Sequence, residues 1–424
     1  RSSDLSAPAA LARDDAAAVV FEQLGAGPVA LDLHLVEQVA RLDADALGVG
    51  EVTRVVVGDG DLQRVAGGAR AQLGEVLRDV GGGKAHRAAD AVAGQVATVG
   101  QFVDLALADA EALGGLGMGP VEGMVVMEEL GRGIVMEPLA QTLIAGAVLS
   151  HYAGADVQAA WCGKVASGEA LVVLAHQERK ARYDIHVCET QATQAGDHWT
   201  LTGAKSMVPA GDQADALLVP AVANGKLALF IVARDAAGVS TQGYRMQDGS
   251  RGAEVKLAGA KAQLVTLNGE AALEHAVDIG IAALCAEAVG VMDKTMAITV
   301  EYMNTRKQFG VAIATFQALR HRVSDMKMQL ELARSMSYYA ALKLNAPAEE
   351  RRRAMSRAKY QLGVSMRFVG QQAVQLHGGI GVTDEYIVSH YFKKLTQLEM
   401  TFGDTLHHLG EVSARMQDTA GVFA

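Results

Sequence analysis

Cysteine is scarce in this chain of 424 residues. Its three cysteines, Cys162, Cys188 and Cys285, are widely spaced, and they match no metal-ligand pattern. A disulfide-stapled secreted domain needs more cysteines, and in pairs, so this class is disfavoured. We therefore expect reduced thiols, buried in the core of a cytoplasmic protein.

Positive charge and long apolar runs are also lacking. The formal net charge is −10, whereas a protein that binds nucleic acid or an anionic membrane needs a basic face. No continuous apolar run approaches the roughly 18 residues that span a bilayer, and no charged-then-apolar leader is seen. We expect no nucleic-acid partner and no membrane span. Half of the residues are apolar, which suffices for two or three packed domains around a cofactor.

Residues 1 to about 100 are dominated by Ala, Gly, Asp and Val and carry few motifs. Residues 55–61 resemble a strand that enters a phosphate-binding loop, but a dinucleotide fingerprint needs three spaced glycines and this segment has two. We interpret it as a plain turn. The three glycines at 81–83 are interpreted as a flexible connection.

The apolar periodicity changes twice along the rest of the chain. Helices are predicted at 121–132 and 139–151, and from about 171 to 267 the period falls toward two, as in an antiparallel sandwich or barrel. The predicted strands are 171–174, 199–202, 216–219, 227–232 and 253–257. A helix with an apolar stripe from 284 to 302 follows, and further helices are predicted at 316–344, 349–376 and 404–416. The predicted fold class is α+β multidomain, with an N-terminal helical domain (1–150), a middle antiparallel β domain (151–270) and a C-terminal helical bundle (271–424).

Two segments offer groups that bind anions. Arg306 ends the striped helix shortly before Gly310, so a cation and backbone amides meet at a chain reversal. Gly378 and Gly379 follow another predicted helix end, where glycine either caps the helix or lets a second molecule approach the backbone. From these residues alone, helix caps with a solvated Arg are the better interpretation, and a phosphate site is the alternative.

Two charged clusters invite a functional reading. Asp404 lies close to His407 and His408 in the sequence, but adjacent histidines point to different faces of a helix, which disfavours a metal site. Three arginines at 351–353 follow two glutamates. We interpret them as a solvated helix face, with phosphate binding as the alternative.

Together these segments resemble the C-terminal domain of the FAD-dependent acyl-CoA dehydrogenases. The matching segments are 306–310 (Arg-Lys-Gln-Phe-Gly), 316–317 (Phe-Gln), 375–381 (Gln-Leu-His-Gly-Gly-Ile-Gly) and 383–386 (Thr-Asp-Glu-Tyr). The chain looks most like the small, β-like subunits of pimeloyl-CoA and steroid side-chain acyl-CoA dehydrogenases. The resemblance covers residues from about 114 to 416.

The resemblance implies a helical N-terminal domain, a middle β domain and a C-terminal four-helix bundle, assembled as a homotetramer or as α2β2. It implies an acyl-CoA substrate, an electron-transfer acceptor, and FAD bound between subunits. In such an assembly, two segments of one chain hold the adenosine and pyrophosphate end of the neighbour's flavin. Carried over, the residues are Arg306, Gln308 and Phe309, with Gln375, Gly378 and Gly379. An arginine fork and an open backbone suit a diphosphate.

The position of the catalytic base departs from the family pattern. The implied chemistry removes the α-proton of the thioester with a carboxylate while a hydride passes to the flavin. An ungapped count from the glycine pair places Phe402 where many members have the base, and Asp404, two residues later, is the candidate base. Other members carry the base at the position of Gly280. Glu287, seven residues further, is interpreted as structural.

The middle domain departs as well. Residues 177–184 (Gln-Glu-Arg-Lys-Ala-Arg-Tyr-Asp) replace the pattern Thr-Glu-Pro-x-Ala-Gly-Ser-Asp, so Arg182 and Tyr183 are expected to crowd the pocket. Residues 207–210 (Met-Val-Pro-Ala) replace Trp-Ile-Thr-Asn, which in the family lies beside the flavin ring.

Our leading hypothesis is a β-like subunit of a heteromeric acyl-CoA dehydrogenase, which forms an α,β-unsaturated acyl-CoA. This chain would complete the FAD site of a related subunit, which supplies the base and the contacts to the flavin ring. One alternative is a self-sufficient dehydrogenase with Asp404 as base. The other is a scaffold or CoA-thioester binder without flavin.

Overall fold

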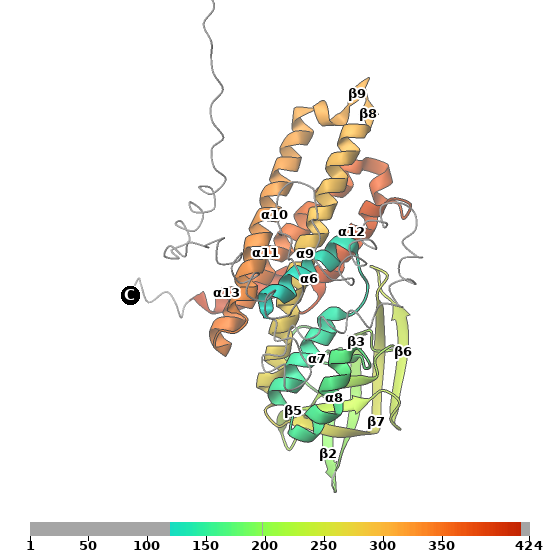
Figure 1. The fold of residues 1–424 in the computed structure, drawn as a ribbon, viewed down its shortest axis with the longest axis vertical. Helices are drawn as coiled ribbons and strands as arrows, with labels where there is room; N and C mark the ends of the chain where they lie inside the picture. Colours follow the sequence, from blue (N-terminus) through green and yellow to red (C-terminus); the bar gives the residue numbers. More distant parts are fainter. Residues whose placement is uncertain (1–118, 197, 417–424) are drawn as a thin grey trace, which may run out of the picture. The chain divides into compact units, whose positions relative to one another are not determined.

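The computed structural model describes residues 119–196 and 198–416, and all of them belong to one compact unit, Gly82–Ala424. The predicted turn at 55–61 lies outside the described residues, as does the connection at 81–83. Along the described part, helices come first, then strands, then helices again (Figure 1). This order confirms the predicted fold class.

The described part begins with three helices, α6 (Pro120–Gly133), α7 (Leu139–Tyr152) and α8 (Ala155–Ser167). The first two match the predicted helices at 121–132 and 139–151. Helix α7 is buried along most of its length. It is tied to strand β1 by a hydrogen bond, in which the backbone amide of Leu174 donates to the side-chain oxygen of Gln141. Helix α8 was not predicted, although its apolar side contributes Val157, Cys162 and Val165 to the core.

Seven strands form one sheet. They are β1 (Val172–Leu174), β2 (Gln191–Ala195), β3 (His198–Pro209), β4 (Ala216–Ala223), β5 (Lys226–Ala233), β6 (Val239–Arg245) and β7 (Arg251–Thr266). Strands β4, β2, β3, β7 and β5 pair in that order, and β5 pairs with β4 again, so these five close into a ring around their own apolar core. Pairing is antiparallel except for β4, which runs parallel to β1 and β2. The parallel pairs arise because long crossover connections separate these strands in the chain.

Strands β2 and β6 were missed by the sequence analysis. Nearly all their side chains are exposed or half-buried, so neither strand shows the alternation of apolar and polar residues on which the prediction relied. Their place in the sheet is set by backbone pairing with β3 and β7.

Helix α9 (Gly269–Thr305) is the core of the helical bundle. It has the length and hydropathy of a membrane span, but 89% of its most apolar 18-residue window is buried inside the fold. Where α9 crosses α6 the backbones touch. A Cβ on Gly290 would lie 1.8 Å from the carbonyl oxygen of Glu128, so only glycine fits there.

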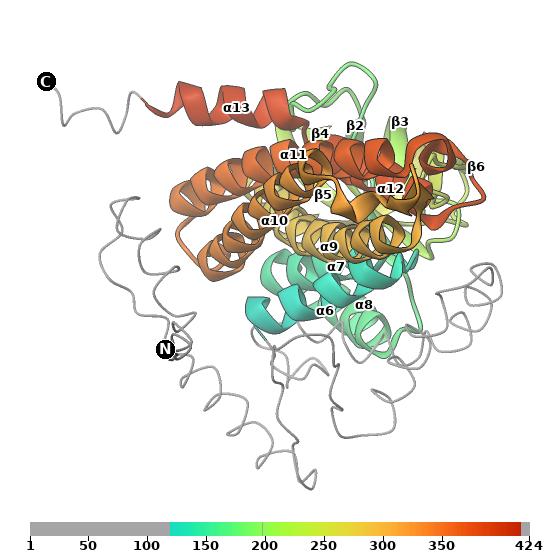
Figure 2. The same ribbon diagram turned by 90° about the horizontal axis from the view of Figure 1, so that it is seen from above.

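Three of the remaining four helices of the described part pack against α9, and the last packs against its neighbour in the bundle (Figure 2). They are α10 (Gln317–Lys343), α11 (Ala348–His377), α12 (Ile387–Met400) and α13 (Thr405–Ala414). The predicted helices at 316–344, 349–376 and 404–416 correspond to α10, α11 and α13. Helix α12 was not predicted. It begins with Ile387 and Val388, which favour strands, and packing of Tyr391 and Leu395 into the core makes the segment helical.

The predicted solvated face at 351–353 is wrong for two of its three arginines. Arg351 and Arg352 each hydrogen-bond to a different oxygen of Asp278, at 3.0 and 2.9 Å, and the Asp278 side chain is only 1% exposed. A buried carboxylate needs such partners. Arg353 is half-buried and pairs with the exposed Glu349, so it fits the prediction in part.

Candidate active site

The first predicted binding segment forms a tight hairpin. Strands β8 (Lys307–Gln308) and β9 (Val311–Ala312) are joined by Phe309 and Gly310, whose φ angles of 54° and 81° are those of a type I′ turn. Positive φ is unfavourable for an aromatic residue, and the Phe309 side chain is nevertheless 92% exposed. Its ring meets that of Phe316 edge-on, with centroids 6.1 Å apart. The tip thus presents a large apolar side chain to solvent.

Arg306 lies directly before this hairpin. Its amide donates to the carbonyl of Tyr302 at 2.8 Å, which ends α9, and its carbonyl accepts from Ile313 at 2.9 Å. Among the described residues the Arg306 guanidinium has no hydrogen-bond or ion-pair partner, and the residue is exposed. The side chain of Gln308 donates only to the neighbouring Lys307 carbonyl. A fixed backbone therefore carries a free cation.

The second predicted segment is the end of α11. Gly378 caps the helix with φ 63° and ψ −141°, a conformation open almost only to glycine. Gln375, Gly378 and Gly379 are exposed, and a Cβ on either glycine would meet nothing within 4 Å. Crowding therefore does not explain the glycines. They leave backbone open to an approaching ligand.

The fold brings the two segments together. Tyr302, one turn before Arg306, stacks on His377, the residue before Gly378, with ring centroids 4.4 Å apart. The β8–β9 hairpin lies at the end of the bundle farthest from the sheet (Figure 1). We call Arg306, Gln308, Phe309, Gln375, Gly378 and Gly379 the clamp. Its six members come from two segments that the sequence separates by more than a whole helix.

The two sequence positions proposed for a base also meet, and no carboxylate stands there. A Cβ on Gly280 would lie 2.4 Å from Cε2 of Phe402, so the phenyl ring packs against the α9 backbone. The other face of Phe402 stacks on His176, with centroids 5.5 Å apart. His176 is half-buried, and its desolvation, together with the charge of nearby Lys205, lowers its pKa to about 4 and keeps it neutral.

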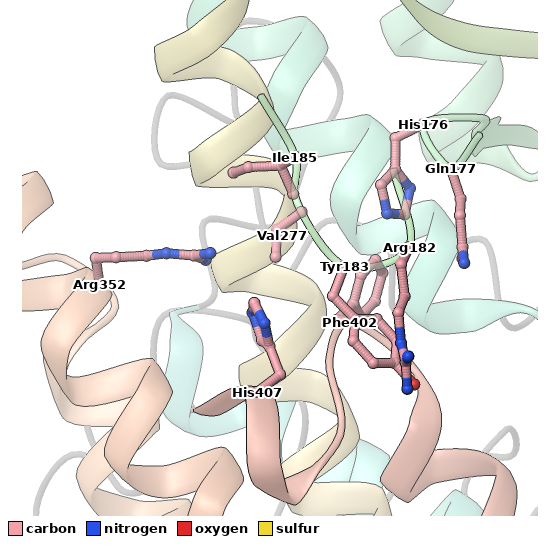
Figure 3. A pocket seen from close by; sticks show the side chains of 9 residues that line it. All are labelled: His176, Gln177, Arg182, Tyr183, Ile185, Val277, Arg352, Phe402 and His407. Atoms are coloured by element: carbon pink, nitrogen blue, oxygen red, sulfur yellow. The ribbon is translucent and has the colours of Figure 1, made fainter. Parts of the chain in front are cut away.

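The space left beside Phe402 is small. The cavity there has a volume of about 10 Å³, which holds about one water. In Figure 3, His176 and Gln177 approach from the loop that follows β1, and Arg352 and His407 from the helices, with Arg182 and Tyr183 between them. The expected crowding by Arg182 and Tyr183 fits this geometry.

A larger cleft of about 680 Å³ adjoins this cavity, and Arg182, Tyr183 and His407 line both. Asp404 lines this cleft and does not line the small cavity. One Asp404 oxygen accepts the His407 amide at 2.8 Å and caps α13, while the other lies 3.7 Å from the Arg182 guanidinium. Both carboxylate oxygens of Asp404, the candidate base, therefore already have partners, one at the start of α13 and one at Arg182.

Two further buried carboxylates, Glu178 and Glu287, are engaged in ion pairs with lysines. Burial by itself would raise the pKa of Glu178, but Lys205 at 2.6 Å and the Thr190 hydroxyl lower it to about 2. Glu287 pairs with Lys394 at 2.7 Å, and both side chains are buried. This pairing supports the structural role predicted for Glu287.

The rings of the adjacent histidines meet edge-on, with centroids 5.0 Å apart, but the two do not form a metal-ligand group with Asp404. His408 is fully buried and donates from Nε2 to the Phe402 carbonyl at 2.9 Å, and burial lowers its pKa to about 3. His407 faces Tyr183 instead. Within the described residues, the one group with metal-ligand geometry is His186, Glu270 and Glu274, largely exposed at the cleft.

Sequence reasoning missed Lys359, a buried residue on α11. Its ammonium donates to three carbonyls, those of Leu398, Glu399 and Gly403, and so holds the turn that aims Phe402. The signal was available, because Lys359 falls on the apolar stripe of Met355, Leu362 and Met366 at helical spacing.

Comparison with known proteins gives consistent results. A family model described as "Acyl-CoA dehydrogenase, C-terminal domain" matches residues 268–417, and one described as "Acyl-CoA dehydrogenase, N-terminal domain" matches residues 87–169. The acyl-CoA dehydrogenase FadE12 of Mycobacterium tuberculosis is 30% identical over 305 residues, 66% of this chain and 76% of that protein.

Solved structures share the fold. A variant of the Tcur3481-Tcur3483 steroid ACAD is 28% identical, with a TM-score of 0.73, over 82% of this chain and 98% of that chain. The ChsE4-ChsE5 complex from Mycobacterium tuberculosis is 24% identical, with a TM-score of 0.72, over 85% and 100%.

Proposed function

Because the chain belongs to the acyl-CoA dehydrogenase family, we propose that it is the β-like subunit of a heteromeric, FAD-dependent acyl-CoA dehydrogenase. In this proposal the clamp holds the diphosphate end of a FAD whose ring lies in a partner subunit. The partner supplies the carboxylate that takes the α-proton of the acyl-CoA. Electrons then pass to a separate electron-transfer acceptor.

Members of this family use FAD, and the clamp suits the phosphate end of that group. Within the part of the chain that the structure describes, Arg306 offers a guanidinium without a partner, and Gly378 and Gly379 offer backbone that no side chain covers. A guanidinium donates several hydrogen bonds and each exposed backbone amide donates one, all from fixed positions, so together they bind phosphate oxygens well. FAD bound there would bring hydride acceptance to the assembly.

The residues at the other end do not suit the flavin ring. The packing of Phe402 on Gly280, with a cavity of about 10 Å³ beside it, is the observation that carries the proposal. The two positions at which the family carries its base are occupied here by Gly280 and Phe402, which pack against each other and offer no carboxylate. A flavin ring and a thioester need hundreds of cubic ångströms, so this pocket would have to be rebuilt to admit them.

The clamp and the closed pocket are also far apart. Arg306 follows Gly280 by 26 positions at the end of the same helix. At 1.5 Å of rise per residue, this is roughly 39 Å along the α9 axis. The clamp is thus placed to serve a site outside this chain's own pocket.

Two solved relatives have names that fit an assembly of two different subunits. The steroid ACAD with 28% identity carries two names joined together, Tcur3481-Tcur3483, and ChsE4-ChsE5, which has the same fold, is a complex. These names support an assembly of two different chains, for which we propose α2β2, and the word steroid points to steroid or lipid catabolism as the setting. The acyl group itself stays open.

The test is the flavin content of two samples. The chain purified alone is expected to be colourless, and the assembly recovered by tagging this chain is expected to hold one FAD per two chains. Arg306→Ala should lower that content, whereas Arg357→Ala serves as control, because Arg357 is exposed on α11 and has no hydrogen-bond or ion-pair partner among the described residues. Full loading with FAD and turnover by the isolated chain would contradict the proposal.

A self-sufficient enzyme with Asp404 as base is the second candidate, favoured by the position of Asp404 on the 680 Å³ cleft. It predicts that Asp404→Asn abolishes exchange of the substrate α-proton by the isolated chain. If the chain is instead a scaffold or CoA-thioester binder, Arg306→Ala changes no flavin content in any assembly.

A further inference from the structure

Three aromatic rings meet where the ends of three helices approach the clamp. Tyr302 belongs to α9, His377 to α11, and Tyr386 precedes α12. The ring centroids of Tyr302 and His377 are 4.4 Å apart, those of His377 and Tyr386 5.1 Å, and those of Tyr302 and Tyr386 5.9 Å. These contacts join the two segments of the clamp, although neither Tyr302 nor Tyr386 belongs to it.

Tyr302 makes a hydrogen bond toward each segment. Its carbonyl accepts the amide of Arg306 at 2.8 Å, and its hydroxyl donates to the carbonyl of His377 at 3.2 Å. One residue therefore fixes the backbone from which the clamp arginine projects and also touches the backbone that leads into the clamp glycines.

The peptide bond between His377 and Gly378 is held at both ends. The carbonyl of His377 accepts the Tyr302 hydroxyl, and the amide of Gly378 donates to the carbonyls of Gln375 and Val374. Because a peptide unit is planar, these bonds set its orientation. The chain then turns at Gly378 with φ 63°, so the orientation of this one peptide decides where the Gly379 backbone points.

The His377 ring reinforces this arrangement. Its Nδ1 lies 2.7 Å from the Ala373 carbonyl, which can only accept, so Nδ1 carries the proton. Nε2 is buried without a partner among the described residues, and burial lowers the pKa of His377. A neutral ring fixed at one nitrogen is a firm surface for Tyr302 to stack on.

We infer that Tyr302 is a positioning residue for the clamp: its hydroxyl sets the His377–Gly378 peptide so that the Gly379 backbone and the Arg306 guanidinium reach the same diphosphate. The inference rests on the proposed function. It assigns Tyr302 no contact with FAD, and it separates the hydroxyl, which orients the peptide, from the ring, which packs.

The test compares two substitutions that each remove one hydroxyl. Tyr302→Phe deletes the hydrogen bond to His377, and Tyr386→Phe is the matched control, because the Tyr386 hydroxyl has no hydrogen-bond partner among the described residues. The flavin-containing assembly recovered with tagged chain is diluted, and loss of FAD is followed by flavin fluorescence. Tyr302→Phe should speed the loss roughly fivefold, the change expected for one hydrogen bond. Tyr386→Phe should leave it unchanged.

Two further readouts separate the explanations. Thermal midpoints of both variants should agree with the unmodified assembly within about 2 °C, since a merely structural role would lower the midpoint of Tyr302→Phe. If Arg306→Ala speeds FAD loss and Tyr302→Phe behaves like Tyr386→Phe, the positioning role is refuted while the proposed function stands. If Arg306→Ala also has no effect, or the assembly holds no flavin, both are refuted.

Discussion

The contact between Gly280 and Phe402 predicts that Gly280→Ala changes the stability of the chain in opposite directions, depending on whether Phe402 is present or has been replaced by alanine. A methyl group added by Gly280→Ala would lie 2.4 Å from Cε2 and 2.8 Å from Cζ of Phe402, so the ring must move. Overpacking of this kind costs about 1–3 kcal/mol. Alanine also favours the helix by about 1 kcal/mol over glycine. The sum is a net destabilisation of roughly 1 kcal/mol.

Phe402→Ala removes the obstacle. Phe402 is half-buried, so this change by itself should cost less than the ~3–5 kcal/mol of a fully buried phenylalanine. In a chain that carries Phe402→Ala, the added methyl group meets no ring and only the helix preference of alanine remains. Gly280→Ala should then stabilise the chain by up to ~1 kcal/mol. The expected coupling between the two sites is therefore about 1–3 kcal/mol.

The measurement is urea unfolding of the four chains of the cycle, followed by circular dichroism. A second cycle, Gly290→Ala with Phe402→Ala, is the control. A Cβ on Gly290 meets the backbone of Glu128, which Phe402 does not influence, so these effects should add. The reasoning is refuted if Gly280→Ala destabilises equally in both backgrounds, since the two base positions would then not share one site.

Three further outcomes are expected. Because Glu178 has a pKa lowered to about 2, its contribution to stability is complete above the ordinary carboxyl pKa of about 4.5 and is lost as the pH falls toward 2. Glu178→Gln should therefore flatten the acid-unfolding curve in that window and, by leaving a buried lysine unpaired, cost about 3–5 kcal/mol at neutral pH. Lys394→Met should cost about 3 kcal/mol in urea unfolding, because it strands a buried carboxylate. The exposed-pair control Lys393→Met should cost ~1 kcal/mol at most, and equal losses would contradict the assignment. Gly378 has φ 63°, so Gly378→Ala should lower the free energy of unfolding by about 1–3 kcal/mol. Gly379→Ala should lower FAD retention by the assembly without a comparable loss of stability. If the two variants are equally stable, backbone strain at Gly378 is refuted.

The sequence predicted most of the fold from periodicity. The long helices at 316–344 and 349–376 were recognised to within a residue or two, because a stripe that repeats over several turns leaves little ambiguity. Strands β2 and β6 and helix α12 were missed. Exposed strands carry no alternation, and α12 is helical because of what it packs against.

For the candidate site, the sequence determined the residue types and the family, and it identified Phe402 and Gly280 as departures. Local patterns carry this information, since glycines, a free arginine and a missing carboxylate are visible in the letters. The tertiary structure decided three matters. It showed that Gly280 and Phe402 touch, that Tyr302 links the two clamp segments, and that Arg351 and Arg352 serve a buried aspartate. These relations join residues far apart in the chain, and packing, rather than any neighbour in the sequence, fixes which side chains meet.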